Sequence, residues 1–464
     1  MRWDGKIRHI PSFFGNDPEP DARRGGPALQ ALWRRRPYAV AVTIVLVVLA
    51  LPFMARRPED WHTVYLPAGK RLIQGFDLYD IQASGGYTYP PAMAWLVIPV
   101  VWLPNVAARA VWYLVSAAAI VMLWRSSWQL TGGSPLEPPG QAEGREHFVF
   151  LLGTLCTFRY VTDALDHQQN DLLVAALVVT GCAAMLLRGR DVPAGVLLGL
   201  AAGIKATPAI WVVLFLLRRA WMGAVAMALA AIAINLPADL FSSPPEGGFW
   251  LASWLKRLVL PAFTGQHGPG LWYTDPLFNQ SLSGTLRRLL TLDWSYIDAN
   301  LRYWPKEGGP SMHIVKVVIF GTQTAVLIAT VAGMGWGGRL SRPAAERSNL
   351  RWQAPACGLL LAAMVLLSPA SSKPHFVVLI LPAFVLARRA AFERDTWAAA
   401  MLGAGLALTF ASNRTIVGRS IGLPGLWLGG VTWSAMALWL GCLGVIMRPA
   451  VENQEPVVGA ADER

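Results

Sequence analysis

Asp60 is the residue whose position in this sequence most directly indicates chemistry. It begins a charged and aromatic segment, Asp60–Pro91, that lies between strongly apolar segments. An ionisable residue held at a membrane surface is a candidate functional group. A carboxylate can accept the proton of an attacking hydroxyl, so we predict that Asp60 is a general base. An ordinary carboxylate at a helix end is the alternative, and the adjacent Glu59 is interpreted as a solvated neighbour.

Lys205 is a second candidate because it interrupts the apolar segment Val192–Leu217. Pro208 follows shortly after it, and proline removes a backbone donor and disfavours helix at the residue before it. We therefore expect two short helices that meet at Lys205. Irregular backbone at membrane depth has to be buried in protein or line a cavity, where a cation would attract an anion. The alternative is a lysine that extends toward lipid headgroups.

Polar and aromatic side chains on other predicted loops are candidate ligand contacts. His167, Gln169 and Asn170 lie between two apolar segments. Their amides could form hydrogen bonds to hydroxyl groups of a ligand, or Asn170 could cap the helix that begins at Asp171. Tyr89 and its aromatic neighbours could stack on an apolar face of a ligand, or belong to the aromatic belt of a membrane protein.

Membrane-spanning helices must position these side chains, because the composition is that of a polytopic α-helical membrane protein. Of the 464 residues, 54% are hydrophobic and 21 are Trp, the mean hydropathy is +0.40, and the apolar residues form about a dozen segments. The first 37 residues are polar and contain Pro and Gly, unlike a cleavable signal peptide. We predict an all-α polytopic integral membrane protein.

Twelve transmembrane helices are predicted, with both termini in the cytoplasm. The predicted helices are Tyr38–Ala55, Ala107–Trp124, Phe148–Leu165, Leu172–Leu187, Val192–Ile204, Pro208–Leu217, Trp221–Leu236, Ile314–Trp336, Gln353–Leu367, Phe376–Ala387, Thr396–Ala411 and Gly425–Met447. This assignment places the basic segments on one side, as the positive-inside rule requires. These segments are Arg34–Arg36, Arg188–Arg190, Arg218–Arg219, Arg339–Arg351, Arg388–Arg389 and Arg448. Residues 1–37 and 448–464 are then cytoplasmic tails of a transmembrane domain, 38–447.

The candidate residues fall together on the opposite, external side. External loops are expected at about 56–106, 166–171, 239–312, 368–375 and 413–424. In the first of them, Pro90–Leu103 is apolar but about 14 residues long, shorter than the roughly 17–25 residues of a spanning helix. We predict that this segment lies along or partly within the outer leaflet.

Charge and cysteine content exclude other classes of protein. The formal net charge of +12 comes from Lys and Arg spread over short loops, which does not indicate a nucleic-acid surface. Four cysteines lie within apolar segments without paired spacing, and we interpret them as small buried side chains rather than disulfides or metal ligands. They are Cys156, Cys182, Cys357 and Cys442.

Five short motifs occur in order between about residues 40 and 390. They are Asp60…Tyr65…Gly75-Phe76-Asp77-Leu78-Tyr79…Tyr89-Pro90-Pro91, His167-Gln168-Gln169-Asn170, Gly199-Leu200-Ala201-Ala202-Gly203-Ile204-Lys205-Ala206-Thr207-Pro208, Asn279-Gln280-Ser281-Leu282 and Ser368-Pro369-Ala370-Ser371 with His375. Together they resemble glycosyltransferase family 87, of the GT-C superfamily, which includes polyprenol-phosphate-mannose-dependent α-mannosyltransferases. The family often has Gly-Gln-x-Asn at the second motif, and a Trp and paired His after Ser-Pro, where this chain has Ser372-Lys373-Pro374-His375. These departures leave the acceptor open.

The resemblance implies a GT-C-type fold and a sugar transfer, with mannose favoured, from a polyprenyl-phosphate donor to a glycolipid or glycan acceptor. The reaction would take place, usually with inversion, on the outer face of a bacterial plasma membrane, with Asp60 at the position of the catalytic acidic residue. The leaving phosphate needs cations or hydrogen-bond donors, and the candidates are Lys205, His375 and Lys373. The candidate contacts to sugar or acceptor are His167, Gln169, Asn170, Tyr89 and Asn279.

No metal or other cofactor is expected. An enzyme that uses a nucleotide sugar usually holds a diphosphate through a metal bound by closely spaced acids, and no Asp-x-Asp occurs on the predicted external side. The expected partners are membrane lipids, the lipid-linked donor and the acceptor, and not nucleic acid. Two other classes stay open. A transporter or flippase would show paired broken helices in two related halves, and a non-catalytic scaffold would not need the candidate residues to converge.

Overall fold

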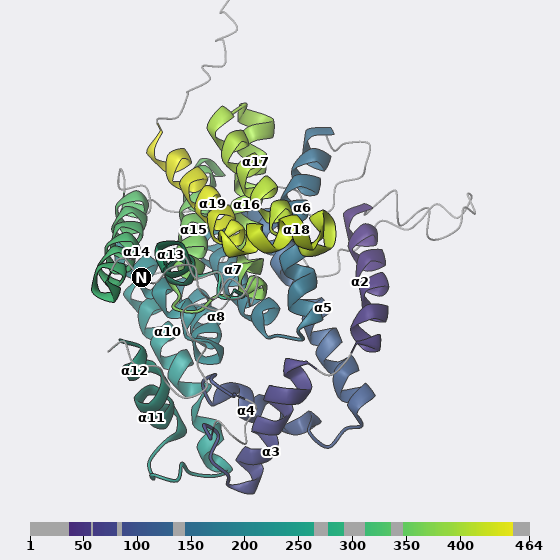
Figure 1. Cartoon of the computed structure of the whole chain (residues 1–464), viewed down its shortest axis with the longest axis vertical. Coiled ribbons are helices and arrows are strands. Elements are labelled where there is room, and N and C mark those ends of the chain that lie inside the picture. Colours follow the sequence, from purple (N-terminus) through teal and green to yellow (C-terminus); the bar gives the residue numbers. More distant parts are fainter. Residues whose placement is uncertain are drawn as a thin grey trace, which may run out of the picture.

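The computed structural model describes residues 37–56, 59–80, 86–132, 144–263, 277–291, 311–335 and 347–448. Figure 1 shows helices throughout this part of the chain, in which no strand occurs. The predicted cytoplasmic tails, the basic segment Arg34–Arg36 and part of Arg339–Arg351 lie outside the described residues. The all-α class is therefore confirmed for the described part.

Most of the bundle consists of long helices, and several of the shorter helices lie at the lower end of the molecule in Figure 1. The bundle helices are α2 (Pro37–Ala55), α5 (Asn105–Leu130), α6 (Gly144–Asp166), α7 (Asp171–Arg188), α8 (Asp191–Ile204), α9 (Val212–Arg218), α10 (Trp221–Ala233), α14 (Met312–Gly335), α15 (Arg347–Leu367), α16 (Ile380–Glu393), α17 (Thr396–Ala411), α18 (Arg414–Trp427) and α19 (Gly430–Met447). The short elements are η1 (Trp61–Tyr65), α3 (Leu66–Gln74), α4 (Ala92–Leu96), η2 (Ile98–Val100), η3 (Thr207–Trp211), η4 (Leu236–Leu240), α11 (Trp250–Trp254), η5 (Leu255–Val259), α12 (Leu260–Phe263), α13 (Leu282–Thr291) and η8 (Lys373–Leu379).

Seven helical segments among the described residues are long and apolar enough to cross a membrane. They are Asn105–Leu130, Gly144–Asp166, Asp171–Arg188, Trp221–Leu240, Met312–Gly335, Lys373–Glu393 and Gly430–Met447. Five shorter apolar helices coincide with the remaining predicted spans: Ala39–Ala55, Asp191–Ile204, Thr207–Arg218, Gln353–Leu367 and Thr396–Ala411. The chain is thus a polytopic membrane protein, while the number of twelve spans stays a prediction.

Ion pairs show which helix ends meet. Arg388 near the end of α16 lies 3.4 Å from Glu146 at the start of α6, and Arg448 after α19 lies 3.2 Å from Asp395 before α17. These basic residues therefore share one end of the bundle, as the alternation of predicted spans requires. The candidate residues are found away from this end.

The predicted break at Lys205 is confirmed. Helix α8 ends at Ile204, Lys205 has extended backbone (φ −148°, ψ 130°), and η3 begins at Thr207 with Pro208 in its first turn. The short helix α9 then completes the segment. Because Pro208 has no N–H to donate, the break loses no backbone hydrogen bond at that residue, and the Lys205 side chain is left at the junction.

A row of glycines on α8 explains part of the Gly199–Pro208 motif. A Cβ added at Gly195 would overlap the Gly223 carbonyl, one at Gly199 the Met227 carbonyl, and one at Gly203 the Ile234 side chain. Helix α8 therefore packs backbone to backbone on α10, as small residues spaced four apart allow in membrane proteins. This close packing sets the position of Lys205 at the end of α8.

We expect Gly199→Ala to lower the free energy of unfolding by about 1–3 kcal/mol, because the added methyl group overpacks the α8–α10 contact. Gly403→Ala on α17 is the matched control, since a Cβ there meets nothing within 4 Å and alanine is favoured over glycine in a helix. Thermal unfolding in detergent measures both. Equal unfolding temperatures for the two variants would contradict this account of the packing.

Three predicted segments have different structures from those expected. Pro90–Leu103 forms two short helices, α4 and η2, instead of one helix. They pack on α3, where a Cβ at Gly69 would overlap the Val97 side chain. The predicted loop 413–424 is largely helical, because α18 begins at Arg414, and the predicted span Gly425–Met447 is divided at Gly429, whose φ is +82°. The four cysteines are buried and free, as interpreted from the sequence.

Candidate active site

Aromatic packing places Asp60 beside the α5, α6 and α7 helices. Asp60 immediately precedes the π-helix η1, whose first residue, Trp61, is buried and stacks on Trp112 of α5 with 4.5 Å between ring centroids. The Trp112 indole N–H donates to the Gln168 carbonyl at 2.9 Å. The segment that carries Asp60 is therefore fixed against the turn between α6 and α7.

That turn presents Gln169 to Asp60. Gln168 has a left-handed backbone (φ 55°), its N–H donates to Leu165 O, and the N–H of Gln169 donates to Ala164 O. This pattern of hydrogen bonds is a Schellman motif, which ends α6. The chain then reverses into α7, and Gln169 Nε2 donates to Asp60 Oδ2 at 2.8 Å. The two residues were predicted from separate motifs, and the structure brings them into contact.

Burial raises the pKa of the half-buried Asp60 carboxyl above its ordinary value. The Gln169 hydrogen bond and the nearby His167 act in the opposite direction, whereas the carboxylates Glu59 and Asp171 add to the rise. A carboxylate with a raised pKa is a stronger base than one in water. The environment of Asp60 thus suits proton transfer.

Asp171, which the sequence reasoning did not select, joins Lys205 and His375. Lys205 Nζ lies 2.6 Å from Asp171 Oδ1, and His375 Nε2 lies 3.7 Å from Asp171 Oδ2. The side chains of Lys205, His375 and Asp171 are 12%, 14% and 6% exposed, so the pair is shielded from water. The sequence did contain a sign of this pair. Asp171 is an acid at the start of an apolar span, and it lies on the same predicted side of the membrane as the isolated Lys205.

A small cavity lies among these side chains. Its lining includes Asp171, Lys205, Thr207, Ser371 and His375, and it has room for about one water molecule. Asp60 and Gln169 do not line it, although Asp60 and Asp171 interact electrostatically. Asp60, Lys205, Gln169 and His375 are therefore neighbours, although only Lys205 and His375 of these four line the cavity.

Amide atoms without hydrogen-bond partners lie on the segment between Gln169, which contacts Asp60, and Asp171, which contacts Lys205. The Asn170 amide is fully buried, and among the residues that the structure describes neither of its polar atoms has a hydrogen-bond partner, nor does Gln169 Oε1. The predicted capping bond from Asn170 is absent. Tyr89 lies beside the same group, with Lys205 Nζ 5.8 Å from its ring centroid. Buried amides without partners are unfavourable, and hydroxyl groups of a sugar would satisfy them.

Lys373 and His375 are two residues apart on η8 but meet different groups. His375 meets Asp171, while Lys373 interacts electrostatically with Asp163, Arg159 and Arg414. His167 lies 3.9 Å from an Asp163 oxygen and 4.0 Å from a Glu59 oxygen. Lys373 therefore belongs to the charged group around Asp163, and His375 to the group around Asp171.

Asn279, one of the predicted sugar contacts, is held by hydrogen bonds within the protein. It is fully buried, its Oδ1 accepts from the N–H groups of Ser281 and Ser371, and its Nδ2 donates to Pro369 O. Asn279 therefore joins the start of α13 to the loop before η8. This arrangement favours a structural role over contact with a sugar.

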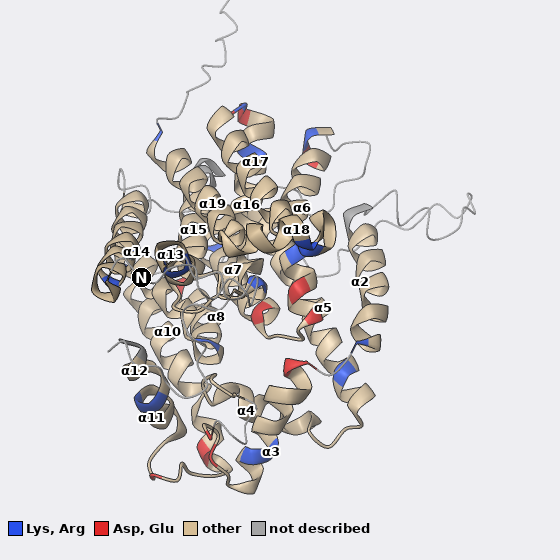
Figure 2. Cartoon of the chain, viewed as in Figure 1, with Lys and Arg blue, Asp and Glu red and all other residues tan. Residues whose placement is uncertain are grey.

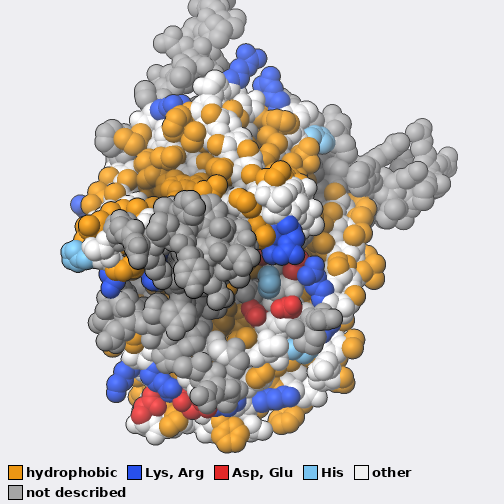
Figure 3. Space-filling model, viewed as in Figure 1, with side chains coloured by type: hydrophobic (Ala, Val, Ile, Leu, Met, Phe, Trp, Pro, Cys, Tyr) orange, Lys and Arg blue, Asp and Glu red, His pale blue; other side chains and the backbone are white. Residues whose placement is uncertain are grey.

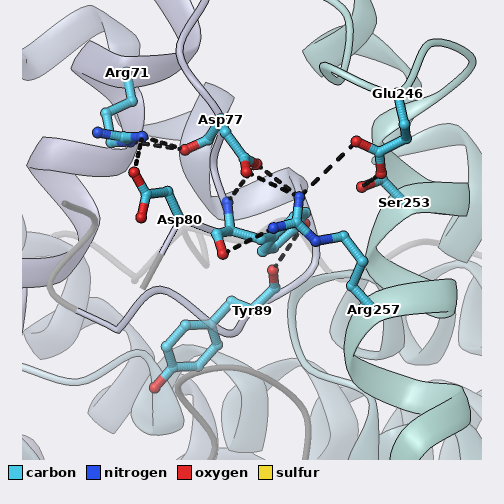
Figure 4. Close-up of polar contacts among 8 residues, drawn as sticks. Arg71, Asp77, Asp80, Tyr89, Glu246, Ser253 and Arg257 are labelled. Atoms are coloured by element: carbon cyan, nitrogen blue, oxygen red, sulfur yellow. Dashed lines mark hydrogen bonds and ion pairs between the residues drawn. The ribbon is translucent and has the colours of Figure 1, made fainter. Parts of the chain in front are cut away.

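Ion pairs and hydrogen bonds of Arg257, Asp77 and Arg71 hold the segment that carries Tyr89 in place (Figure 4). Arg257 Nη1 lies 2.9 Å from Asp77 Oδ1, and its Nη2 donates to the Tyr79 carbonyl at 3.1 Å. Tyr79 in turn donates to the Tyr89 carbonyl at 3.3 Å. Arg71 binds the Asp77 carbonyl from the opposite direction. The described part of the predicted loop 239–312 thus supports the first external loop.

Comparison with known proteins identifies the family. A sequence model of glycosyltransferase family 87 matches residues 87–369. The chain belongs to glycosyltransferase family 87. The matched range contains Gln169, Asn170, Asp171 and Lys205, while Asp60 and His375 lie outside it. As a family 87 protein with several apolar helices, it is a membrane glycosyltransferase.

Two curated relatives carry the same name, polyprenol-phosphate-mannose-dependent alpha-(1-2)-phosphatidylinositol mannoside mannosyltransferase. The protein from Mycolicibacterium smegmatis is 25% identical over 370 residues, which are 76% of this chain and 75% of the relative. The protein from Mycobacterium tuberculosis is 27% identical over 257 residues, which are 51% of this chain and 56% of the relative.

No group of three His, Cys, Asp or Glu side chains that could hold a metal ion occurs within the described ranges. The sequence-based expectation that catalysis needs no metal or other cofactor stays a prediction.

Proposed function

We propose that this family 87 protein transfers mannose from polyprenyl phosphate mannose to a glycolipid or glycan acceptor, with Asp60 as the general base. The reaction takes place at the outer face of a bacterial plasma membrane. Both chain termini lie on the other side, in the cytoplasm. The observation that carries the proposal is the contact of Asp60 with Gln169, next to the Asp171–Lys205–His375 group. The names of the two relatives support the donor.

The Asp60 carboxylate accepts the proton of the acceptor hydroxyl as its oxygen attacks the anomeric carbon of the donor sugar. A bond forms between that oxygen and the anomeric carbon, and the bond from the carbon to the phosphate oxygen breaks. Attack from the face opposite the phosphate inverts the configuration at the anomeric carbon. Asn170 and Gln169 provide amide groups for the sugar hydroxyls, and Tyr89 provides an apolar ring.

Lys205 and His375 are proposed to stabilise the negative charge on the departing polyprenyl phosphate. An ammonium group has three donors, and Asp171 occupies one of those of Lys205. Because the present cavity holds about one water molecule, the donor phosphate has to displace side chains to reach it. The isoprenoid tail stays in the membrane, since each methylene transferred to water costs about 0.8 kcal/mol.

The pH dependence of transfer tests the base. The value of kcat/KM should fall as the pH is lowered through the pKa of Asp60, with a midpoint above the ordinary Asp value of about 3.9. Gln169→Leu removes a bond that lowers this pKa, so the midpoint should move to higher pH. Glu59→Gln removes a charge that raises it, so the midpoint should move to lower pH.

These opposite shifts would show that the fall of kcat/KM at low pH is caused by protonation of Asp60. If both variants kept the wild-type midpoint, or shifted it in the same direction, another group would be the base.

A further inference from the structure

The hydroxyl group of Tyr65 is buried beside the site without a hydrogen bond of normal geometry. The Tyr65 side chain is 0% exposed, and its Oη has no hydrogen-bond partner in the part of the chain that the structure describes. The hydroxyl of Tyr89 interacts with it but does not form such a bond. A buried tyrosine hydroxyl usually finds a partner, and leaving a buried donor unpaired is unfavourable. Tyr65 therefore has a hydrogen bond to offer to a ligand.

The π-helix η1 places Tyr65 on the same side as Asp60. Asp60 directly precedes η1, Tyr65 is its last residue, and the N–H of Leu66 donates to Trp61 O, five residues earlier. Residues five apart are neighbours on successive turns of such a helix. In an α-helix, with 3.6 residues per turn, they would point about 140° apart. The π-helical turn thus brings the Tyr65 side chain to the face that carries the proposed base.

Ring contacts connect Tyr65 to the proposed phosphate site as well. The ring centroids of Tyr65 and Tyr89 are 5.2 Å apart, and Lys205 Nζ lies 5.8 Å from the Tyr89 centroid. Lys205 in turn lies 2.6 Å from Asp171 Oδ1. In agreement with these contacts, the Tyr65 hydroxyl interacts electrostatically with both Asp60 and Asp171. Tyr65 therefore lies between the proposed base and the cations proposed for the leaving phosphate.

The exposed side chains around Asp60 are charged, whereas Tyr65 belongs to an aromatic layer behind them. Glu59 and His167 are 43% and 50% exposed. Figure 2 shows acidic residues at the end of α6 and at the start of the segment that continues into α3, and Figure 3 shows charged and His side chains gathered on this face. The Tyr65 ring lies against Trp61 and Trp112, with centroids 6.3 Å and 6.4 Å away. A sugar that reaches Asp60 from the charged face meets this aromatic layer.

We propose that the Tyr65 hydroxyl donates a hydrogen bond to a hydroxyl group of the sugar that is transferred, and that this contact helps to determine which sugar the protein accepts. The inference rests on the proposed function and adds a specificity-determining residue to it. Tyr65 does not line the small cavity beside Asp171. The sugar, like the phosphate, therefore has to displace side chains when it binds.

The position of Tyr65 favours the transferred sugar over the acceptor as its partner. In an inverting transfer, the acceptor oxygen, the anomeric carbon and the phosphate oxygen lie roughly on one line. The base is at one end of that line, beside the acceptor, and the cations are at the other end, beside the phosphate. A side chain between Asp60 and the Asp171–Lys205 pair therefore faces the ring that carries the anomeric carbon.

Thermal unfolding in detergent, without substrate, tests whether the hydroxyl is free for a ligand. Tyr65→Phe removes a buried donor that has no hydrogen bond, so this variant should unfold at the same temperature as the wild type or at a higher one. Tyr160→Phe on α6 is the matched control, because the buried Tyr160 hydroxyl lies 2.9 Å from the Thr409 hydroxyl. It should unfold at a lower temperature. An equally lowered temperature for Tyr65→Phe would show that its hydroxyl is already paired, and would overturn the proposal.

Donors that lack single hydroxyl groups test the contact itself. Transfer is measured in proteoliposomes from polyprenyl phosphate mannose and from its analogues deoxygenated at C2, C3, C4 or C6. Tyr65→Phe should lower kcat/KM by about tenfold with mannose, as expected for one hydrogen bond, and by less than about twofold with the one analogue that lacks the contacted hydroxyl. Tyr160→Phe should leave the ratios between donors unchanged. A similar loss with mannose and all its analogues, or no loss with mannose, would overturn the proposal.

A binding measurement without acceptor separates this contact from the proposed function. Polyprenyl phosphate mannose should raise the unfolding temperature of the wild type more than polyprenyl phosphate does, and Tyr65→Phe should reduce that difference. If the wild type showed the difference and Tyr65→Phe reduced it, but no mannose were transferred, the proposed function would be rejected and the sugar contact would stand. An equal difference in Tyr65→Phe, or none in the wild type, would reject the contact.

Discussion

Asp60→Asn should lower kcat/KM for mannose transfer by at least about 100-fold, the lower end of what a general base contributes. Asparagine keeps the shape of the side chain and can still accept the hydrogen bond from Gln169, so the α6–α7 turn should remain in place. Only the ability to take a proton is lost. Transfer of labelled mannose to acceptor, with the variant at the same amount in the membrane as the wild type, measures the effect.

Glu59→Gln is the matched control, because Glu59 is the adjacent carboxylate and its side chain is 43% exposed. It should keep activity within a factor of about ten. If Asp60→Asn itself stayed within that factor, a change of about 1.4 kcal/mol in the barrier, the base would have to be another residue.

The pair of Asp171 and Lys205 should show the largest effect on stability. Asp171→Ala or Lys205→Ala leaves one buried charge uncompensated, which costs about 3–5 kcal/mol in comparable pairs. The double variant Asp171→Leu/Lys205→Met removes both charges and should be less destabilised than either single variant. Thermal unfolding in detergent measures all three proteins.

The same variants separate structure from function. The double variant should fold but use the lipid-linked donor poorly, because no ammonium remains near the leaving phosphate. Lys205→Arg should retain more donor use than Lys205→Ala. If the effects of the two single variants simply added in the double variant, the pair would not be coupled, and its assignment as one unit would be wrong.

Features set by local backbone chemistry could be predicted from the sequence. The break at Lys205 followed from Pro208. The close α8–α10 contact at the glycines before it was not predicted, because the glycine motif alone does not say which helix packs against it. Helix positions also followed from the apolar segments, because each such segment has to satisfy its backbone within the membrane. The end of the last helix was predicted well, and its start was not, because Gly429 divides an apolar stretch of uniform composition.

The direction of side chains could not be predicted. Asn279 and Gln169 are both amides beside a helix start, yet Asn279 is turned into the protein and Gln169 reaches Asp60. Lys373 and His375 are close in sequence, but the tight 3-10 helix directs them to different neighbours. Asp171 was missed for the same reason, since its partnership with Lys205 depends on how α7 and α8 pack.

Transfer from a lipid-linked donor is the most direct test of the central proposal. Purified protein in proteoliposomes is given polyprenyl phosphate carrying labelled mannose, with a glycolipid acceptor and no nucleotide sugar. We predict that the label appears in the acceptor with the wild type and that Asp60→Asn reduces this product to near background. Product that forms only when GDP-mannose is supplied, or donor that crosses the bilayer without any transfer of mannose, would contradict the proposal.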